Sequence, residues 1–292
     1  MQITIPYAPR ELQLEIHEQL AKHRWAVLSL HRRAGKSVMC INELIKRALT
    51  NKLWNPRYAY IGPTYKQTKS IIFDYLKHYA GVIPGIKFNE QELSCTFPNG
   101  AKITLLGSEN PDSLRGNYFD GIIADEYAQI NPRLFPEIIR PALSDRKGFC
   151  YMVGTPQGMS NDFYAKYQHA LQDDAWYTKI AKASETKIID QEELDAARSV
   201  MGDKKYRQEY ECDWVAAIEG AVYGDAIEKL ESRKQISRVP YDPMYKVSTA
   251  WDIGLSDSTS IIFYQQVGKA IHVIDYYENR NEALPHYIGV LE

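Results

Sequence analysis

The sequence lacks a long apolar run and has little cysteine. No eighteen consecutive apolar residues occur, so no segment is expected to span a membrane as a helix, which needs roughly twenty. The four cysteines, Cys40, Cys95, Cys150 and Cys212, are widely spaced. This spacing favours reduced thiols in a cytosolic compartment over disulfides or a zinc site. The seven histidines form no pair at i, i+4 spacing, and the N-terminus lacks the pattern of a secretory signal.

The chain also lacks an excess of charge of one sign. Lysine and arginine total 35, aspartate and glutamate total 37, and the net charge is −2. The protein as a whole is therefore not a basic nucleic-acid binder, and any surface that binds a polyanion such as DNA must be a local basic patch. Its 292 residues suffice for a full α/β domain and part of a second.

What the sequence does contain is a Gly-Lys-Ser between a predicted strand and a predicted helix. Residues 25–30 form an apolar run of strand length, and residues 37–49 carry apolar side chains at helical spacing. The loop between them would present backbone N–H groups and a helix N-terminus to an anion. Lys36 would reach the β- and γ-phosphates of a nucleotide, and the Ser37 hydroxyl would ligate magnesium.

The loop departs from the full phosphate-loop pattern at one position. The pattern G-x-x-x-x-G-K-[ST] would place glycine at position 30, where this chain has Leu30. Because a bare Gly-Lys-Ser is common by chance, a surface loop with a basic run remains the alternative. The phosphate-binding interpretation depends on the strand before the loop and the helix after it.

An Asp-Glu pair closes a second apolar run. Residues 121–124 predict a buried parallel strand, and Asp125 and Glu126 follow it. Ligands of open α/β sheets lie outside the carboxyl ends of the strands. There Asp125 would hold magnesium, directly or through water, and Glu126 would orient and deprotonate the attacking water. A solvated turn is the alternative for the pair alone, but its place downstream of Gly-Lys-Ser favours hydrolysis of ATP.

Strand-like runs alternate with helical patterns through residues 25–155, which predicts a parallel sheet with helices on both faces. The further predicted strands are 58–61, 93–97, 102–106, 122–125 and 149–153, and the further predicted helices are 12–22, 67–79 and 134–139. Residues 97–101, Phe-Pro-Asn-Gly-Ala, predict a hairpin turn. A helical stretch over residues 190–211 ends this domain.

A second pattern begins after a break in periodicity. Residues 216–246 carry Gly220, Gly224, Pro240 and Pro243 and predict a linker, with a short helix near 226–230. Three strands joined by short turns are then expected at 247–251, 260–264 and 271–275. The predicted organisation is therefore a first domain over 1–215, a linker over 216–246 and a partial second domain over 247–292.

Six short motifs follow one another along the chain. They are Pro9-Arg10 with Gln13, Arg32-x-x-Gly35-Lys36-Ser37, Leu114-Arg115-Gly116, Ile123-Ala124-Asp125-Glu126, Gly154-Thr155-Pro156 and Trp251-Asp252-Ile253-Gly254. In this order they resemble the motifs of the large terminase subunit of tailed bacteriophages, over nearly the whole chain. That family's phosphate loop often lacks the first glycine and carries arginine instead, so Leu30 agrees with the resemblance.

The resemblance implies a RecA/ASCE-like P-loop ATPase that binds ATP and Mg²⁺ and drives double-stranded DNA into a procapsid. Arg32 would act as an arginine finger on the γ-phosphate, and Arg33 is a weaker candidate, with a solvated cation as its alternative. Gly154 and Thr155 would couple hydrolysis to a subdomain movement, unless they only end a strand before a proline turn.

The resemblance also assigns an adenine side. Arg10 and Gln13 match the family's adenine-side motif, with Tyr7 as a possible stacking partner, although both residues are ordinary at the start of an amphipathic helix. Together the implied nucleotide-binding residues are Arg10, Gln13, Arg33, Ala34, Gly35, Lys36 and Ser37.

Trp251-Asp252-Ile253-Gly254 resembles the first strand of the family's RNase H-like nuclease domain. Asp252 would bind Mg²⁺ or Mn²⁺ for two-metal phosphodiester cleavage, and Asp257 is either a further ligand or an ordinary turn aspartate. Asp275 is expected at the end of its strand. In the family the remaining acids follow further along, so the nuclease is expected to be represented by its first strands only and to be inactive in this chain.

The implied partners are double-stranded DNA, a portal protein and a small terminase subunit. The chain would be monomeric in isolation, would form a homo-oligomeric ring on the portal, and would act in the host cytoplasm and transiently on the procapsid, not in the mature virion. Arg115 lies in a loop that would contact DNA or a neighbouring subunit, with a structural turn as the alternative. Lys66 and Lys69 are further candidates for DNA contact.

Two other classes of function remain open. A superfamily 2-type helicase or translocase would need a second RecA-like domain with its own arginine finger, and residues 246–292 do not begin like one. A non-hydrolysing assembly module would bind ATP and dock on a portal without turnover. The presence of both Lys36 and Glu126 favours hydrolysis over that alternative.

Overall fold

The computed structural model describes residues 4–216, 229–230, 233–254, 258–280 and 282–291, and the chain divides into two compact units, Met1–Gly220 and Ala221–Glu292. Each unit is described by itself. The predicted boundaries of the ATPase domain, the linker and the nuclease segment remain predictions, and the helix expected near 226–230 lies mostly outside the described residues. Within those residues, no helix is both long enough and apolar enough to cross a bilayer.

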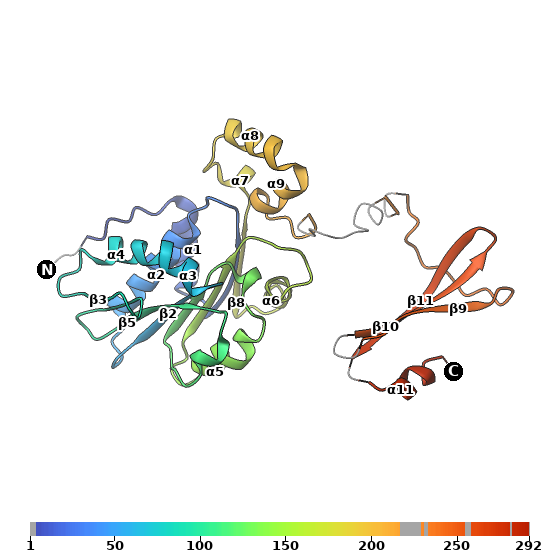
Figure 1. The fold of residues 1–292 in the computed structure, drawn as a ribbon. Helices are drawn as coiled ribbons and strands as arrows, with labels where there is room; N and C mark the ends of the chain where they lie inside the picture. Colours follow the sequence, from blue (N-terminus) through green and yellow to red (C-terminus); the bar gives the residue numbers. More distant parts are fainter. Residues whose placement is uncertain (1–3, 217–228, 231–232, 255–257, 281, 292) are drawn as a thin grey trace. The chain divides into compact units, whose positions relative to one another are not determined.

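The first unit carries a sheet whose strands alternate with helices (Figure 1). Its strands are β1 (Trp25–Leu30), β2 (Arg57–Gly62), β3 (Lys87–Asn89), β4 (Ser94–Thr96), β5 (Lys102–Gly107), β6 (Gly121–Ala124), β7 (Phe149–Gly154) and β8 (Trp176–Ala181). Its α-helices are α1 (Glu11–Leu20), α2 (Lys36–Thr50), α3 (Tyr65–Gln67), α4 (Phe73–Ala80), α5 (Arg140–Ala142), α6 (Asp162–Ala170), α7 (Ala183–Thr186), α8 (Gln191–Met201) and α9 (Asp203–Tyr210). Four short helices, η1 (Thr68–Ile72), η2 (Pro111–Leu114), η3 (Tyr127–Gln129) and η4 (Phe135–Ile139), complete it.

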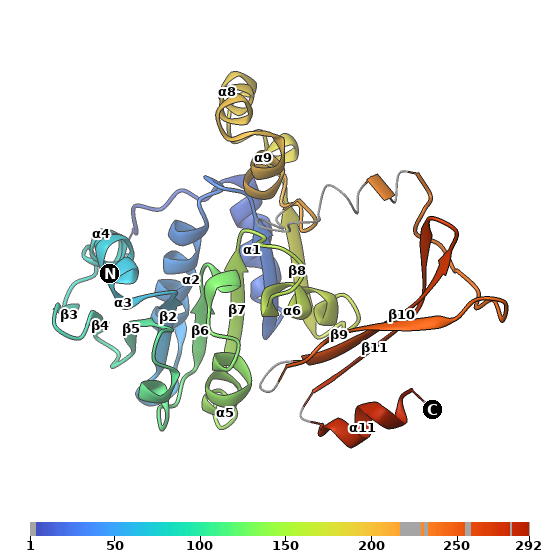
Figure 2. The same cartoon turned by 45° about the vertical axis from the view of Figure 1, so that its right-hand side comes forward.

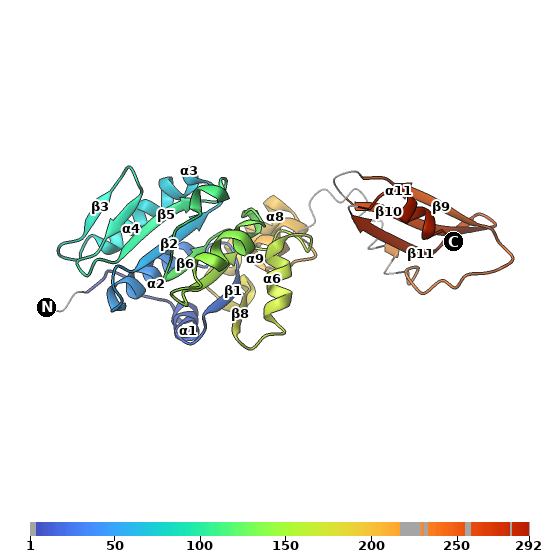
Figure 3. The ribbon, with the colours of Figure 1, turned by 90° about the horizontal axis from the view of Figure 1, so that it is seen from below.

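The strand order is β3-β4-β5-β2-β6-β7-β1-β8, and Figure 3 views this sheet with β3 and β8 at its two ends. Every pair from β5 to β8 is parallel, whereas β3–β4 and β4–β5 are antiparallel. The predicted parallel sheet and the hairpin at residues 97–101 are thus confirmed. Since β7 lies between β1 and β6, the segments that follow these three strands meet at one edge of the sheet.

Helices cover both faces of the sheet, as predicted. Alternate strand residues point to opposite faces, and the buried side chains form two clusters accordingly. One cluster joins Leu28 and Tyr60 to α1, α2 and α4, and the other joins Val27 and Ile61 to η4 and α6. All four cysteines are buried free thiols within the described residues.

Two of the predicted helices contain a π-helical turn. The stretch 67–79 is not one continuous α-helix but α3, the π-helix η1 and α4, and 134–139 corresponds to the π-helix η4 followed by α5. A π-turn shifts the backbone hydrogen bonds by one residue. The spacing of apolar residues in the sequence does not reveal such a shift. The stretch 190–211 is broken at Gly202, whose φ of 78° does not fit a helix.

Several elements were not predicted, including β3, β8 and α6. The residues of β8 are mostly half-buried, so the strand lacks the apolar run that marked the central strands. Figures 1 and 2 show α7, α8 and α9 grouped together, away from the helices that cover the two faces.

The second unit contains an antiparallel sheet in the order β11-β10-β9. The strands β9 (Val247–Asp252), β10 (Ser258–Val267) and β11 (Ala270–Arg280) confirm the three predicted strands, and the helix α11 (Leu284–Gly289) lies on one face of the sheet (Figure 2). The prediction that Asp275 ends its strand is wrong. Asp275 lies inside β11, opposite Phe263. The strand continues past it because backbone pairing with β10 extends to the Ser258–Arg280 pair.

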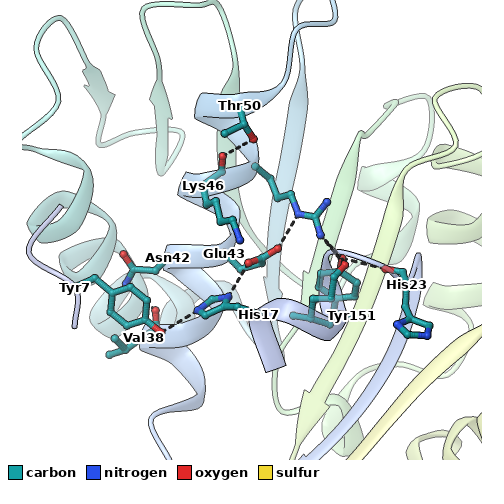
Figure 4. A network of polar contacts seen from close by, with 11 residues as sticks. Tyr7, His17, His23, Val38, Asn42, Glu43, Lys46, Thr50 and Tyr151 are labelled. Atoms are coloured by element: carbon teal, nitrogen blue, oxygen red, sulfur yellow. Dashed lines mark hydrogen bonds and ion pairs between the residues drawn. The ribbon is translucent and has the colours of Figure 1, made fainter. Parts of the chain in front are cut away.

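A buried charged network links α1, α2 and β7 in the first unit. Figure 4 shows the Glu43 carboxylate beside His17, with Tyr7 beyond it. One carboxylate oxygen lies 2.7 Å from His17 Nδ1, and the other accepts from Arg47 Nε at 2.7 Å. Arg47 also donates to the Tyr151 hydroxyl of β7 at 3.0 Å. The Glu43 side chain is 1% exposed, so its charge depends on these partners.

Replacing Glu43 with glutamine should lower the free energy of unfolding by about 3 kcal/mol at neutral pH, because it removes one charge of a buried pair. Burial alone would raise the pKa of Glu43, but hydrogen bonds from His17 and Arg47 outweigh burial and lower it below the ordinary value of 4.5. This stabilisation is present above the unfolded-state pKa and is lost as pH falls through the folded-state pKa.

Urea unfolding at pH 7 measures the stability lost by the variant, and urea unfolding below pH 4.5, the ordinary pKa of Glu43, measures how much of that stabilisation depends on pH. The parent should lose more stability on acidification than Glu43→Gln does. Glu18→Gln, which removes an exposed carboxylate from α1, is the matched control and should behave like the parent. Equal unfolding free energies of parent and Glu43→Gln at both pH values would contradict the prediction.

Candidate nucleotide-binding site

A cavity of about 840 Å³ opens where β1, β6 and β7 end. The residues predicted from sequence that line it are Arg10, Arg32, Arg33, Gly35, Lys36, Ser37, Asp125, Glu126 and Thr155. Gln13, Ala34, Gly154 and Tyr7 are not among the lining residues. The volume lies in the usual range of small-molecule sites, about 300–1,000 Å³.

The Lys36 ammonium lies at the bottom of the phosphate loop, and its residue is 9% exposed. Nζ donates to the carbonyl oxygens of Leu30 at 3.3 Å and His31 at 3.4 Å, and to Thr155 Oγ1 at 3.1 Å. The nearest carboxylate oxygen, Glu126 Oε1, is 4.0 Å away. These contacts hold the charge where an incoming phosphate can exchange with neutral oxygen atoms.

The shape of the loop depends on Gly35 and Gln13. Gly35 precedes α2 with a φ of 84°, and an added Cβ would lie 2.8 Å from Gln13 Nε2. Gln13 Nε2 donates to the Gly35 carbonyl at 3.1 Å, and Gln13 Oε1 accepts from the Arg10 backbone N–H at 2.9 Å. Both ends of the Gln13 amide are therefore engaged in supporting the loop, and Arg10 is the member of its motif that reaches the cavity.

Asp125 is buried beside the first turn of α2. Ser37 Oγ donates to Asp125 Oδ2 at 3.1 Å, and the Tyr60 hydroxyl donates to the same oxygen. The other oxygen, Oδ1, accepts from the Glu126 backbone N–H at 2.9 Å. A hydroxyl and one carboxylate next to a phosphate site suit Mg²⁺, which keeps several waters and takes its other ligands from the substrate phosphates. Sequence reasoning missed Tyr60, which lies inside an apolar strand without a polar neighbour to mark it.

Glu126 directly precedes η3 and lies in the left-handed region, with a φ of 50°. Such strain in a non-glycine residue is often associated with functional sites. Burial raises the pKa of the Glu126 carboxyl, and the Lys36 ammonium opposes this effect. The carboxylates of Asp125 and Glu209 raise it further. A raised pKa brings a carboxylate closer to the range in which it can accept a proton from water.

Arg32 extends from the loop toward α9. Its side chain is 61% exposed, and Nη1 lies 3.8 Å from Glu209 Oε2. The Arg32 backbone N–H donates to the Glu209 carbonyl at 2.8 Å, so the loop is also tied to α9 through the main chain. Arg33 is in the left-handed region, with a φ of 68°, and lines the same cavity. Glu209 lies in a strongly charged helix, where nothing in the sequence distinguished it.

The α9 helix also contacts the segment that follows β7. Gln208 is 4% exposed, and its Nε2 donates to the Pro156 carbonyl at 2.9 Å. Neighbouring residues of α9 thus contact the phosphate loop on one side and the Gly154-Thr155-Pro156 motif on the other. Thr155 itself accepts from Lys36, which places this motif directly against the phosphate loop.

The remaining predicted residues lie elsewhere. Asp252 is exposed at the end of β9, where it lies opposite Ser260 of β10 in the sheet. On the other side of β10, Ser260 lies opposite Glu278 of β11. Asp257 lies outside the described residues. In the part of the chain that the structure describes, no group of three or more His, Cys, Asp or Glu side chains is arranged to hold a metal. Arg115 is paired with Asp112 at 2.7 Å and with Glu137 at 3.1 Å.

Comparison with known proteins agrees with the resemblance seen in the sequence. A family model described as the terminase large subunit, T4likevirus-type, N-terminal, matches residues 27–229. The chain belongs to this family. The large terminase subunit of Escherichia phage T5 is 21% identical over 285 residues, which cover 93% of this chain and 63% of the relative.

Two solved structures show the same fold. The large terminase ATPase domain of Thermus phage P74-26 aligns with a TM-score of 0.61 and 24% identity, over 72% of this chain and 95% of that one. The large terminase of a thermophilic bacteriophage, solved in complex with ADP, aligns with a TM-score of 0.60 and 13% identity, over 96% of this chain and 72% of that one. The P-loop ASCE fold predicted from the sequence is thereby confirmed. The chain spans 36% to 63% of the length of the curated relatives it matches.

Proposed function

We propose that this chain is the ATP-hydrolysing motor subunit of a phage terminase, which moves double-stranded DNA into a procapsid. The observation that carries the proposal is the convergence of Lys36, Ser37, Asp125 and Glu126 on one cavity at the ends of β1 and β6. This set provides phosphate binding, a magnesium-compatible pair and a candidate base. Membership of the terminase family supports double-stranded DNA as the substrate.

The geometry suggests how each group would act. Lys36 would exchange its carbonyl partners for the β- and γ-phosphate oxygens, and the N-terminus of α2 would add its backbone N–H groups. Ser37 and Asp125 would hold Mg²⁺, which would neutralise charge on the phosphates. Glu126 would orient a water in line with the γ-phosphate and take its proton. Arg32 would leave Glu209 to stabilise the transition-state charge.

The route from hydrolysis to movement would run through Thr155 and α9. Loss of the γ-phosphate changes what Lys36 binds, and Thr155 is hydrogen-bonded to Lys36. Gln208 connects α9 to Pro156, directly after Thr155. The phosphate loop also contacts α9 directly, through the hydrogen bond and the ion pair between Arg32 and Glu209. A shift of the loop would therefore be transmitted to α9 both through Arg32 and through the segment after β7.

The helicase alternative is not favoured. It requires a second RecA-like domain, whereas the described part of the second unit is an antiparallel three-stranded sheet. That strand order, with Asp252 at the end of the first strand, supports the start of an RNase H-like nuclease. Within the described residues no group of three or more His, Cys, Asp or Glu side chains is arranged to hold a metal there, and Asp252 by itself would hold a hydrated ion only loosely. The chain as given is therefore expected not to cut plasmid DNA with Mg²⁺ or Mn²⁺.

DNA binding by the motor should be weak, independent of sequence and steeply dependent on salt, because phosphate contacts release counterions. Lys66 and Lys69 are exposed on α3 and η1. Arg115 is 53% exposed but engaged by two acids. Replacing Lys66 and Lys69 together by alanine should lower the slope of log Kd against log salt by about 1 to 2.

Fluorescence anisotropy with two duplexes of unrelated sequence, titrated over a range of salt concentrations, measures this slope. The exposed pair Lys46 and Lys52, replaced by alanine, is the matched control and should leave the slope unchanged. Sequence-specific binding that is insensitive to salt would contradict a translocating motor.

A further inference from the structure

A second cavity opens at the edge of the sheet opposite the nucleotide site. It has a volume of about 410 Å³ and lies where β1, β2 and β7 begin. Lys22 and Arg24, which precede β1, line it together with Lys147, which precedes β7. The length of β1, six residues or about 20 Å, separates this cavity from the phosphate loop. A ligand bound here would therefore not touch the nucleotide.

Several charges around this second cavity are already balanced inside the protein. Arg47 Nε lies 2.7 Å from Glu43 Oε1. The Asp120 carboxylate accepts from the Arg57 backbone N–H at 2.8 Å and lies 3.9 Å from Arg146 Nη1. These pairs cancel, so the net charge of the cavity is set by the ionisable groups that remain.

Four cations at this edge have no carboxylate partner within the described residues, and together they are named here the amino-edge site. They are Lys22, Arg24, Arg140 and Lys147. Three of them are exposed, and Arg24 is half-buried. Lys22 follows the end of α1, where a cation also complements the helix dipole. That dipole does not account for the other three, which lie on α5 or directly before β1 and β7.

Two of these cations lie against one aromatic side chain. Arg24 Cζ is 4.7 Å and Arg140 Cζ is 5.2 Å from the centre of the Trp25 ring. Arg24 is held by hydrogen bonds from Nε to the Gly148 carbonyl at 2.6 Å and from Nη2 to the Leu143 carbonyl at 3.1 Å. Its Nη1 makes no hydrogen bond in the part of the chain that the structure describes. Burial and the like charge of Arg140 both lower the pKa of Arg24.

The amino-edge site is suited to phosphate groups. Guanidinium groups bind phosphate oxygens through two parallel hydrogen bonds, and lysine binds them as a point charge. A single free phosphate, with a charge of about −2 at neutral pH, would balance only half of the four cations. Duplex DNA carries about one negative charge per 1.7 Å of its axis, so its backbone can engage several of them at once.

We propose that the amino-edge site binds the phosphate backbone of duplex DNA. The choice of DNA over a free phosphate rests on the proposed function, whereas the affinity for phosphate follows from the four unpaired cations. The site is separate from the candidates Lys66 and Lys69. Those residues flank Gln67 and Thr68, which line the nucleotide cavity at the other edge of the sheet.

The test is the salt dependence of duplex DNA binding by the whole chain, measured by fluorescence anisotropy. Lys22→Gln/Lys147→Gln, which changes two exposed side chains, should lower the slope of log Kd against log salt by about 1 to 2. Arg140→Gln should lower it by about 1, and Arg140→Lys, which keeps the charge, should retain the parental slope. ATP hydrolysis without DNA should stay at the parental rate in all three variants, because the site lies away from the nucleotide.

Lys87→Gln/Lys187→Gln is the matched control. Both lysines are exposed, lie outside the lining of the second cavity and have no ion pair within the described residues. This variant should keep the parental slope. A parental slope in Lys22→Gln/Lys147→Gln, or an equal loss in the control, would overturn the amino-edge site.

A second arm distinguishes DNA from a free anion. Inorganic tripolyphosphate is titrated by calorimetry into Lys36→Ala, so that the phosphate loop does not contribute. Tripolyphosphate binding that is lost on adding Lys22→Gln/Lys147→Gln, together with an unchanged DNA slope, would indicate a site for free polyphosphate and overturn the assignment to DNA. The DNA slope is measured without ATP, so a parent that fails to hydrolyse ATP would refute the proposed ATPase function and leave this readout intact.

Discussion

Glu126→Gln is expected to bind ATP with nearly parental affinity and to lose hydrolysis by about 10²- to 10⁴-fold. The amide keeps the size of the side chain and its place 4.0 Å from Lys36, but it cannot accept a proton from water. Replacing the Glu126 carboxyl, whose pKa is raised by burial, should therefore slow the hydrolysis step without changing ATP binding. Phosphate release gives kcat, and calorimetry with ATP gives the affinity.

Lys36→Ala provides the contrasting result. It removes the ammonium that would bind the phosphates, so binding and turnover should fall together. Glu192→Gln, an exposed carboxylate in the first turn of α8, is the matched control for the charge change and should hydrolyse ATP like the parent. If Glu126→Gln hydrolyses ATP at the parental rate, Glu126 is not the base.

Arg32→Ala should lower kcat by roughly 10³-fold, the usual effect of removing an arginine finger, with a much smaller change in ATP affinity. The Arg32 side chain is 61% exposed, and its ion pair with Glu209 is 3.8 Å long. Pairs of this kind contribute about 0–1 kcal/mol, so the guanidinium can leave Glu209 for a transition-state phosphate at little cost. Single-turnover phosphate release, beside ATP binding, separates the two effects.

Arg33→Ala is the matched control, since Arg33 is adjacent in the same loop and lines the same cavity. It should change kcat far less than Arg32→Ala does. A silent Arg32→Ala together with a strong effect of Arg33→Ala would show that the loop alignment is off by one residue. The left-handed backbone at Arg33 makes a fold check by circular dichroism necessary for that variant.

The parts of the fold that the sequence predicted best are the buried central strands. The run 25–30 matches β1 residue for residue, because a strand buried on both faces is nearly continuously apolar. The half-buried β8 gave no such signal. The π-turn in η1 was also hidden, since it changes hydrogen bonds and leaves the apolar spacing similar.

The sequence by itself determined the phosphate loop and the carboxylate pair, because each motif is a local unit in which neighbouring residues follow one strand end. Lys36 and Asp125 lie near each other because β1 and β6 are parallel strands of one sheet, separated only by β7. The tertiary structure alone decided the partners from other elements: Tyr60 on Asp125, Glu209 on Arg32, Gln13 on Gly35 and Tyr75 in the cavity wall. These contacts join distant segments through strand order and helix packing, so no local pattern of residues encodes them.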